Sequence, residues 1–142
     1  IPTSSSFKIL GSSSSGNAAV LRVHDQTILI DAGLSGKKLQ FLLGEEGIAI
    51  EELTAVFLTH EHNDHSAGIR GLSKFGRLPI FANRDTVQAI QAKLPRRPNW
   101  KIFETGKPFS FESFVVLNEI QFVKFPLCAT PIPPALVSAK KG

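Results

Sequence analysis

The sequence predicts a mixed α/β domain. Short apolar segments bounded by Gly, Ser, Asn or Asp recur along the chain, which is typical of buried strands. Other segments place apolar residues three and four positions apart, which is typical of helices that pack one face on a core. With 142 residues, the chain is long enough for one modest domain that buries most of its apolar surface.

The order of these segments gives the expected elements. The expected strands are residues 7–10, 18–23, 27–30, 55–58, 78–82, 100–104, 109–117 and 120–127. The expected helices run from a Ser35 N-cap to Leu43, from a Ser66 cap to about Phe75, and from Asn83 to Leu94. A Gly- and Ser-rich loop over residues 11–17 is expected to join the first two strands.

Composition bounds the domain and its surroundings. Residues 1–6 are expected to form a loose leader, residues 7–127 the domain, and the proline-rich residues 128–142 an irregular or disordered tail. The single cysteine, Cys128, excludes an internal disulfide and fits a reducing compartment. No apolar run is long enough to span a membrane, so we expect a cytoplasmic protein. The net charge of +4 suits a polyanionic partner, although a solvated surface is the commoner reason for such an excess.

A dense histidine cluster follows the expected strand 55–58. The segment Thr59–His65 holds three of the four histidines, His60, His62 and His65, together with Asp64. Neutral imidazole and carboxylate are donors that suit zinc and, to a lesser degree, manganese. Because residues two apart in an extended segment point the same way, His60 and His62 could grip one ion and leave Asp64 and His65 to a second. The cluster therefore predicts a site for one or two metal ions.

This cluster resembles the H-x-H-x-D-H motif of the metallo-β-lactamase fold superfamily. The Gly- and Ser-rich segment 11–17 and the segment Asp31-Ala-Gly33 stand where that superfamily has its first glycine-rich turn and its strand-Asp-Gly turn. The serine-rich version resembles the YycJ-type branch, whose members are regarded as nucleases acting on DNA ends. The resemblance implies an αββα sandwich, of which this chain looks like the N-terminal half.

Further roles are expected beyond metal binding. By the resemblance, Asp31 would support the metal loop by hydrogen bonding from behind the ligands; a turn-capping aspartate is the alternative. Asp64 would orient the attacking water or accept its proton. Ser14, Ser15 and Asn17 could offer hydroxyl and N–H groups to a phosphate, although a flexible turn explains the same composition equally well.

The expected function is hydrolysis of a phosphodiester, most simply in nucleic acid, by a metal-activated water. The chain has no histidine after His65, whereas the superfamily completes its site with downstream ligands. Cys128 could replace one of them, but an idle thiol is the simpler explanation. We therefore expect weak metal binding, and an uncovered apolar sheet face that favours self-association. The alternatives are an inactive truncated module and a thioester or lactam hydrolase of the same fold.

Overall fold

The structure is a computed structural model, and it describes residues 5–13, 15–23, 25–59, 62–104, 109–111, 114–117 and 121–124. One sheet contains β1 (Ser5–Ser13), β2 (Gly16–Val23), β3 (Gln26–Ile30), β4 (Ala55–Phe57), β5 (Pro79–Asn83) and β6 (Asn99–Phe103), in that spatial order. A second sheet contains β7 (Phe109–Phe111), β8 (Phe114–Leu117) and β9 (Gln121–Lys124). The helices are α1 (Gly36–Glu45), α2 (Asn63–Ser66), α3 (Ile69–Leu72) and α4 (Arg84–Gln91), with a 3₁₀ turn over Ile50–Glu52. The expected α/β class is confirmed.

The direction of the strands changes within the first sheet. The strands β1, β2 and β3 pair antiparallel, whereas β3, β4, β5 and β6 pair parallel through helical connections. Parallel strands end at the same edge of a sheet, so the loops that follow β3 and β4 meet there. This edge carries the site described below.

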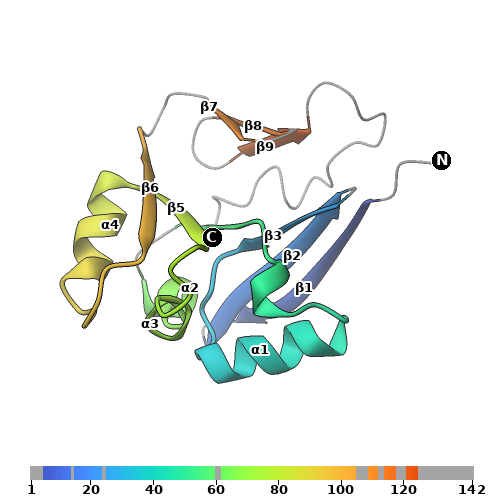
Figure 1. Cartoon of the computed structure of the whole chain (residues 1–142), viewed down its shortest axis with the longest axis horizontal. Helices are drawn as coiled ribbons and strands as arrows, with labels where there is room; N and C mark the ends of the chain where they lie inside the picture. The colour runs from blue at the N-terminus through green and yellow to red at the C-terminus, as the bar shows by residue number, and fades with distance from the viewer. Residues whose placement is uncertain are drawn as a thin grey trace.

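The main core lies between the sheet and the helices. It includes Leu29 and Val56 from central strands and Leu39, Leu43 and Leu72 from the helices, all of them buried. Figure 1 shows α1 and the second sheet on opposite sides of the six-stranded sheet. Burying these side chains supplies the main favourable term for packing the helices on the sheet, about 1.5–3 kcal/mol for each large aliphatic group.

The opposite face of the sheet is also buried, contrary to the expectation of an uncovered apolar face. Ile28 and Phe57 have no exposed surface there, and Phe81 is 9% exposed. The rings of Phe57 and Phe81 stack across neighbouring strands, with centroids 4.6 Å apart. The second sheet lies on this side in Figure 1, so the chain itself covers the face that was expected to drive self-association.

Two of the three predicted helix starts are confirmed. The hydroxyl of Ser35 accepts a hydrogen bond from the backbone N–H of Lys38, and the side chain of Asn83 accepts one from Thr86. Such caps satisfy N–H groups that have no partner within the helix. The third prediction is wrong, because the helical segment begins at Asn63, and the Ser66 hydroxyl donates to the carbonyl of His62.

Three other predicted boundaries differ from the structure. Most of the expected loop 11–17 is strand, because β1 runs to Ser13 and β2 begins at Gly16. The expected strand 109–117 is a pair of antiparallel strands, β7 and β8. β1 begins at Ser5, inside the expected leader, while residues 1–4 and the tail 128–142 lie outside the described residues. In the part of the chain that the structure describes, no helix is long and apolar enough to cross a bilayer.

Candidate metal centre

The site begins where β3 and β4 end side by side. The backbone N–H of Asp31 donates to the carbonyl of Phe57 at 2.8 Å, which extends the parallel ladder by one residue. Asp31 then adopts a φ of 63°. This left-handed conformation is rare for residues other than glycine, and aspartate tolerates it better than most. The turn aims the Asp31 side chain across the end of β4.

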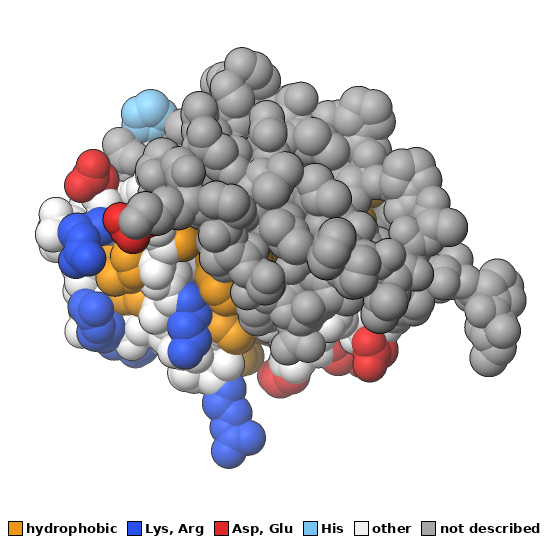
Figure 2. Space-filling model, turned by 90° about the horizontal axis from the view of Figure 1, so that it is seen from above, with side chains coloured by type: hydrophobic (Ala, Val, Ile, Leu, Met, Phe, Trp, Pro, Cys, Tyr) orange, Lys and Arg blue, Asp and Glu red, His pale blue; other side chains and the backbone are white. Residues whose placement is uncertain are grey.

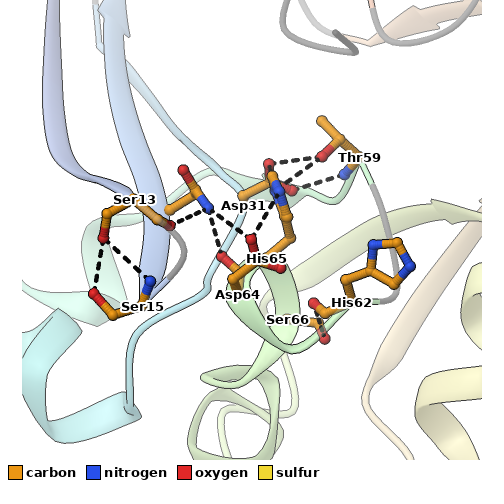
Figure 3. Close-up of polar contacts among 9 residues, drawn as sticks. Ser13, Ser15, Asp31, Thr59, His62, Asp64, His65 and Ser66 are labelled. Atoms are coloured by element: carbon orange, nitrogen blue, oxygen red, sulfur yellow. Dashed lines mark hydrogen bonds and ion pairs between the residues drawn. The ribbon is translucent and has the colours of Figure 1, made fainter. Parts of the chain in front are cut away.

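The carboxylate of Asp31 joins the two ends of the histidine motif. It accepts hydrogen bonds from the backbone N–H of Thr59 at 2.8 Å and from the Thr59 hydroxyl at 2.7 Å. Its Oδ2 also lies 2.7 Å from Nδ1 of His65 (Figure 3). The side chains of Asp31 and His65 are only 8% and 12% exposed. Asp31 therefore fixes the orientation of the His65 ring in a largely buried position.

This contact determines which nitrogen of His65 faces outward as an acceptor. A carboxylate only accepts hydrogen bonds, so Nδ1 carries the proton and Nε2 keeps its lone pair in the neutral ring. The hydrogen bond to Asp31 raises the pKa of His65 above its ordinary value of 6.5. Burial lowers this pKa, whereas the negative charges of Asp31 and Asp64 raise it further. The net shift is upward, so His65 binds a proton or another cation more readily than a free imidazole.

Asp64 lies on the outward side of the His65 ring. Its Oδ2 is 3.7 Å from Nε2 of His65. The amide of Asn17, from the start of β2, donates to this carboxylate oxygen at 3.2 Å and to the Asp64 carbonyl at 3.0 Å. The same amide group donates to the carbonyl of Ser13 at 2.8 Å. Asn17 thus ties the β1–β2 hairpin to the helix that carries Asp64.

The loop after β3 passes through this site with almost no clearance. The N–H of Gly33 donates to the carbonyl of Asn17, and the N–H of Ala32 donates to the carbonyl of His65. A Cβ atom on Gly33 would overlap the Asp64 carbonyl oxygen and would stand 2.6 Å from the Asn17 nitrogen. Only glycine lets the three backbone segments approach this closely. The requirement for glycine at this position follows from close packing rather than from an unusual φ.

The donor set suits a divalent cation. Two bonds of about 2.0–2.2 Å from one zinc ion can reach donors that are up to about 4 Å apart, so Nε2 of His65 and Oδ2 of Asp64 could share an ion. Among the described residues, no group of three or more His, Cys, Asp or Glu side chains is arranged to hold a metal. His60 lies outside the described residues, and Figure 3 shows the ring of His62, at the start of α2, to one side of the Asp31–His65 pair.

The structure brings together some of the predicted residues. Asp31, Asp64, His65 and Asn17 gather in one hydrogen-bonded group, with Asn17 holding Asp64. The hydroxyl of Ser15 pairs with that of Ser13 at 2.8 Å on the exposed hairpin. Ser14 and Cys128 lie outside the described residues. The substrate contacts predicted for Ser14, Ser15 and Asn17 therefore stay predictions.

Two residues of this group had no role in the sequence analysis. Thr59 hydrogen-bonds Asp31, and its hydroxyl lies 3.3 Å from Nδ1 of His65. Gly33 provides the close approach between the loop and α2. The sequence did contain a signal for Thr59. This hydroxyl residue stands directly before the motif, just after β4, and β4 pairs with β3, the strand that leads to Asp31.

The carboxyl edge of the parallel strands β3 and β4 thus carries the Asp31 and Gly33 turn and the His65 ring side by side. The family model of the metallo-beta-lactamase superfamily matches residues 13–134. The chain belongs to this superfamily.

Individual relatives agree with this assignment. The chain is 38% identical over 132 residues to the exodeoxyribonuclease WalJ of Streptococcus pneumoniae serotype 2, and this match spans 84% of the chain and 49% of the relative. It is 32% identical over 120 residues to the exodeoxyribonuclease YycJ of Bacillus anthracis, over 80% of the chain and 46% of that protein. Among solved structures, the metallo-beta-lactamase fold protein YhfI from Bacillus subtilis superposes with a TM-score of 0.64 at 21% identity, covering 80% of the chain and 51% of YhfI. The chain thus spans about half the length of these relatives.

Proposed function

We propose that the chain supplies the metal-binding part of a metal-dependent nuclease that cleaves phosphodiester bonds in DNA. The relatives named exodeoxyribonuclease support this choice of substrate, since they share 32–38% identity with most of the chain. The net charge of the chain, +4, is compatible with a polyanionic substrate. The reducing compartment that we expect from the single cysteine would be the cytoplasm.

The observation that carries the proposal is the fixed geometry of His65. Asp31 holds Nδ1 at 2.7 Å, so Nε2 faces the carboxylate of Asp64. A carboxylate behind a histidine is the usual arrangement for a histidine that binds a metal ion. A structural histidine with no ligand would not need an acidic group on each side of its ring.

The roles of the other residues follow from this frame. His60, His62, Asp64 and His65 would hold one or two zinc or manganese ions, and Asp31 would position His65. A divalent ion bound there supplies Lewis-acid activation of water and stabilises the charge that develops on the phosphate. Asp64, held by Asn17, would orient the attacking water or accept its proton at Oδ2.

The test is cleavage of end-labelled single- and double-stranded DNA by the purified chain, with manganese, with zinc, and with a chelator. We expect shortening of the labelled strand that requires metal and is abolished by His62→Ala and by Asp64→Asn. The control is His24→Ala, the histidine outside the motif. DNA cleavage that persists in Asp64→Asn, or no cleavage by the unaltered chain in any metal, would contradict the proposal for this chain.

A second candidate is a module that keeps the metal motif without turnover. The observation that favours it is the distribution of histidines, because all four lie at or before residue 65. An ion held by few protein donors binds weakly, since tight sites use three or four preorganised ligands. Weak metal binding that depends on His65, together with an absence of DNA cleavage, would select this candidate. A thioester or lactam hydrolase of the same fold would instead cleave those substrates in preference to DNA.

A further inference from the structure

A cleft opens beside the metal motif, between α2, α3 and the C-terminal end of α4. Its volume is about 200 Å³. Arg70 and Lys93 line it together with the polar side chain of Asn63, and Ile90 and Leu94 form an apolar wall. Sites for drug-sized ligands usually have volumes of about 300–1,000 Å³, so this cleft is small for an enclosed small molecule. It is better suited to one unit of a chain that continues beyond it.

The helical segment that carries the metal motif also forms one wall of the cleft. Asn63 begins α2 and Arg70 lies in α3, which are two separate short helices, and both residues line the cleft. Asp64 and His65 point away from it, toward Asn17 and Asp31. The cleft therefore runs from the motif past Ser66 and Ala67 to Arg70.

The cleft carries positive charge that has no local counter-charge. None of its lining residues is acidic. Arg70 and Lys93 are exposed, and neither side chain forms an ion pair with any residue that the structure describes. The backbone N–H of Lys93 donates to the carbonyl of Ile90 at 3.0 Å, which holds Lys93 in a turn directly after α4. Two cations supplied by separate elements therefore flank one apolar wall.

The segment that supplies Lys93 to the cleft has an excess of positive charge. Figure 2 shows Lys and Arg side chains at the left, with some Asp or Glu side chains among them, at the end of the molecule where Figure 1 places α4 and β6. Apolar side chains lie between these cations in the same view. Residues 84–104 contain five cations (Arg84, Lys93, Arg96, Arg97 and Lys101) and two acids (Asp85 and Glu104). An anionic strand leaving the cleft would continue over a basic surface.

We infer that this cleft, formed by Asn63, Arg70 and Lys93, binds the phosphodiester backbone of a single DNA strand next to the bond that is cleaved. Arg70 and Lys93 bind phosphate oxygens, Asn63 donates to the phosphate nearest the metal motif, and Ile90 and Leu94 contact sugar or base. The inference rests on the proposed function for its substrate class. It adds a strand-binding site that begins at Asn63 in the motif and extends to Arg70 and Lys93, which lie outside it.

The test compares Arg70→Ala/Lys93→Ala with a control of equal charge change, Arg22→Ala/Lys38→Ala. Arg22 lies on β2 and Lys38 on α1, and neither lines the cleft. Binding of fluorescein-labelled dT12 is measured by anisotropy in the presence of a chelator, over a series of salt concentrations. We expect the cleft variant to bind several-fold more weakly. The slope of log K against log salt should fall by about 1.4, which is two phosphates at about 0.7 each for a single strand.

The control variant should keep most of the affinity for dT12 and most of the salt dependence. The charge-conserving variant Arg70→Lys/Lys93→Arg should keep both as well. Equal losses in the two alanine variants would overturn the inference, as would unchanged binding in the cleft variant or no dT12 binding by the unaltered chain. Tighter binding of rU12 than of dT12 would assign the cleft to RNA and overturn its assignment to DNA. Unchanged melting temperatures check that the variants fold.

A second readout separates this inference from the proposed function. Bis(p-nitrophenyl) phosphate is too short to reach the cleft, so the cleft variant should hydrolyse it, with manganese, at the rate of the unaltered chain. On dT12 the same variant should show a raised KM with little change in kcat. If no form of the chain hydrolyses either substrate, the proposed function fails, and the binding measurements with chelator still decide the inference.

Discussion

Asp31 and His65 are 34 positions apart in the chain, yet Oδ2 of Asp31 lies 2.7 Å from Nδ1 of His65. The parallel pairing of β3 with β4 creates this contact, because it places Asp31 beside the start of the histidine motif. The contact fixes both the orientation of the ring and the nitrogen that remains available to a metal.

Removing the Asp31 carboxylate should weaken metal binding while leaving the ligands in place. Asp31→Asn retains a side chain that tolerates a φ of 63° but replaces the anionic acceptor. Carboxylates behind metal-binding histidines typically contribute 10–100-fold to affinity, and we expect a loss in this range for zinc. A competition titration with a chromophoric chelator measures it. Unchanged zinc affinity in Asp31→Asn would show that His65 does not depend on this contact.

The raised pKa of His65 predicts how the stability of the metal-free chain changes with pH. The folded state holds the proton more tightly than the unfolded state, so this contribution to the free energy of unfolding is fully present below pH 6.5. It is lost as the pH rises from 6.5 through the higher pKa of the folded state. The difference in unfolding free energy between the unaltered chain and His65→Gln should therefore shrink over that interval. Urea unfolding at several pH values tests this, and a difference that grows with pH would contradict it.

Protonation of His65 should also oppose metal binding, because the added proton occupies Nε2. Zinc affinity should rise with pH until the raised pKa of His65 has been passed, and then level off. The Asp31→Asn variant lacks the main cause of the raised pKa, so its affinity should level off at a lower pH. Calorimetric titrations in buffers of different ionisation enthalpy measure both the affinity and the number of protons released.

Gly33→Ala should destabilise the fold around the motif. Its methyl group would overlap the Asp64 carbonyl, so the loop after β3 or the start of α2 must move. Overpacking of this kind typically costs about 1–3 kcal/mol. The matched control is Gly44→Ala in α1, where an added Cβ meets no atom within 4 Å, and a gain of about 0.5–1 kcal/mol is expected. Thermal unfolding of the two variants compares the positions, and equal effects would refute the close-packing argument.

Asn17→Ala should loosen Asp64 without removing any proposed ligand. It deletes donors to the carbonyl and the carboxylate of Asp64 and to the carbonyl of Ser13. Each lost hydrogen bond is worth about 0.5–1.5 kcal/mol, so we expect lower stability together with weaker zinc binding. Ser15→Ala is the control on the same hairpin, since its hydroxyl pairs only with Ser13 among the described contacts. A loss of zinc affinity that is equal in both variants would argue against a specific role for Asn17.

Local signals in the sequence predicted much of the fold. Ser35 and Asn83 cap their helices because short polar side chains before amphipathic segments satisfy free N–H groups. Ser66 has the same chemistry, but it lies inside a helical turn and donates to the His62 carbonyl instead. Whether a serine caps a helix or donates within it depends on where the helix begins. The motif residues before Ser66 have no apolar periodicity, so the sequence did not locate that start.

The residue types of the candidate site could be predicted from the sequence, but the contacts between these residues could not. The spacing of His62, Asp64 and His65 indicated a metal site, and the apolar strand before Asp31 placed that residue at a sheet edge. Neither signal reveals that Asn17 reaches Asp64, because that contact depends on the antiparallel pairing of β2 with β3. The cleft lined by Arg70 and Lys93 could not be predicted from the sequence either, because its two walls come from segments that only the tertiary structure brings together.

Zinc titration of the purified chain and of its His65→Gln variant, with His24→Gln as the control, tests the central claim most directly. The structure predicts that the unaltered chain and His24→Gln bind zinc with the same affinity, and that His65→Gln loses most of it. Equal zinc binding by His65→Gln and the unaltered chain would contradict the proposal that His65, positioned by Asp31, is a ligand of the metal centre.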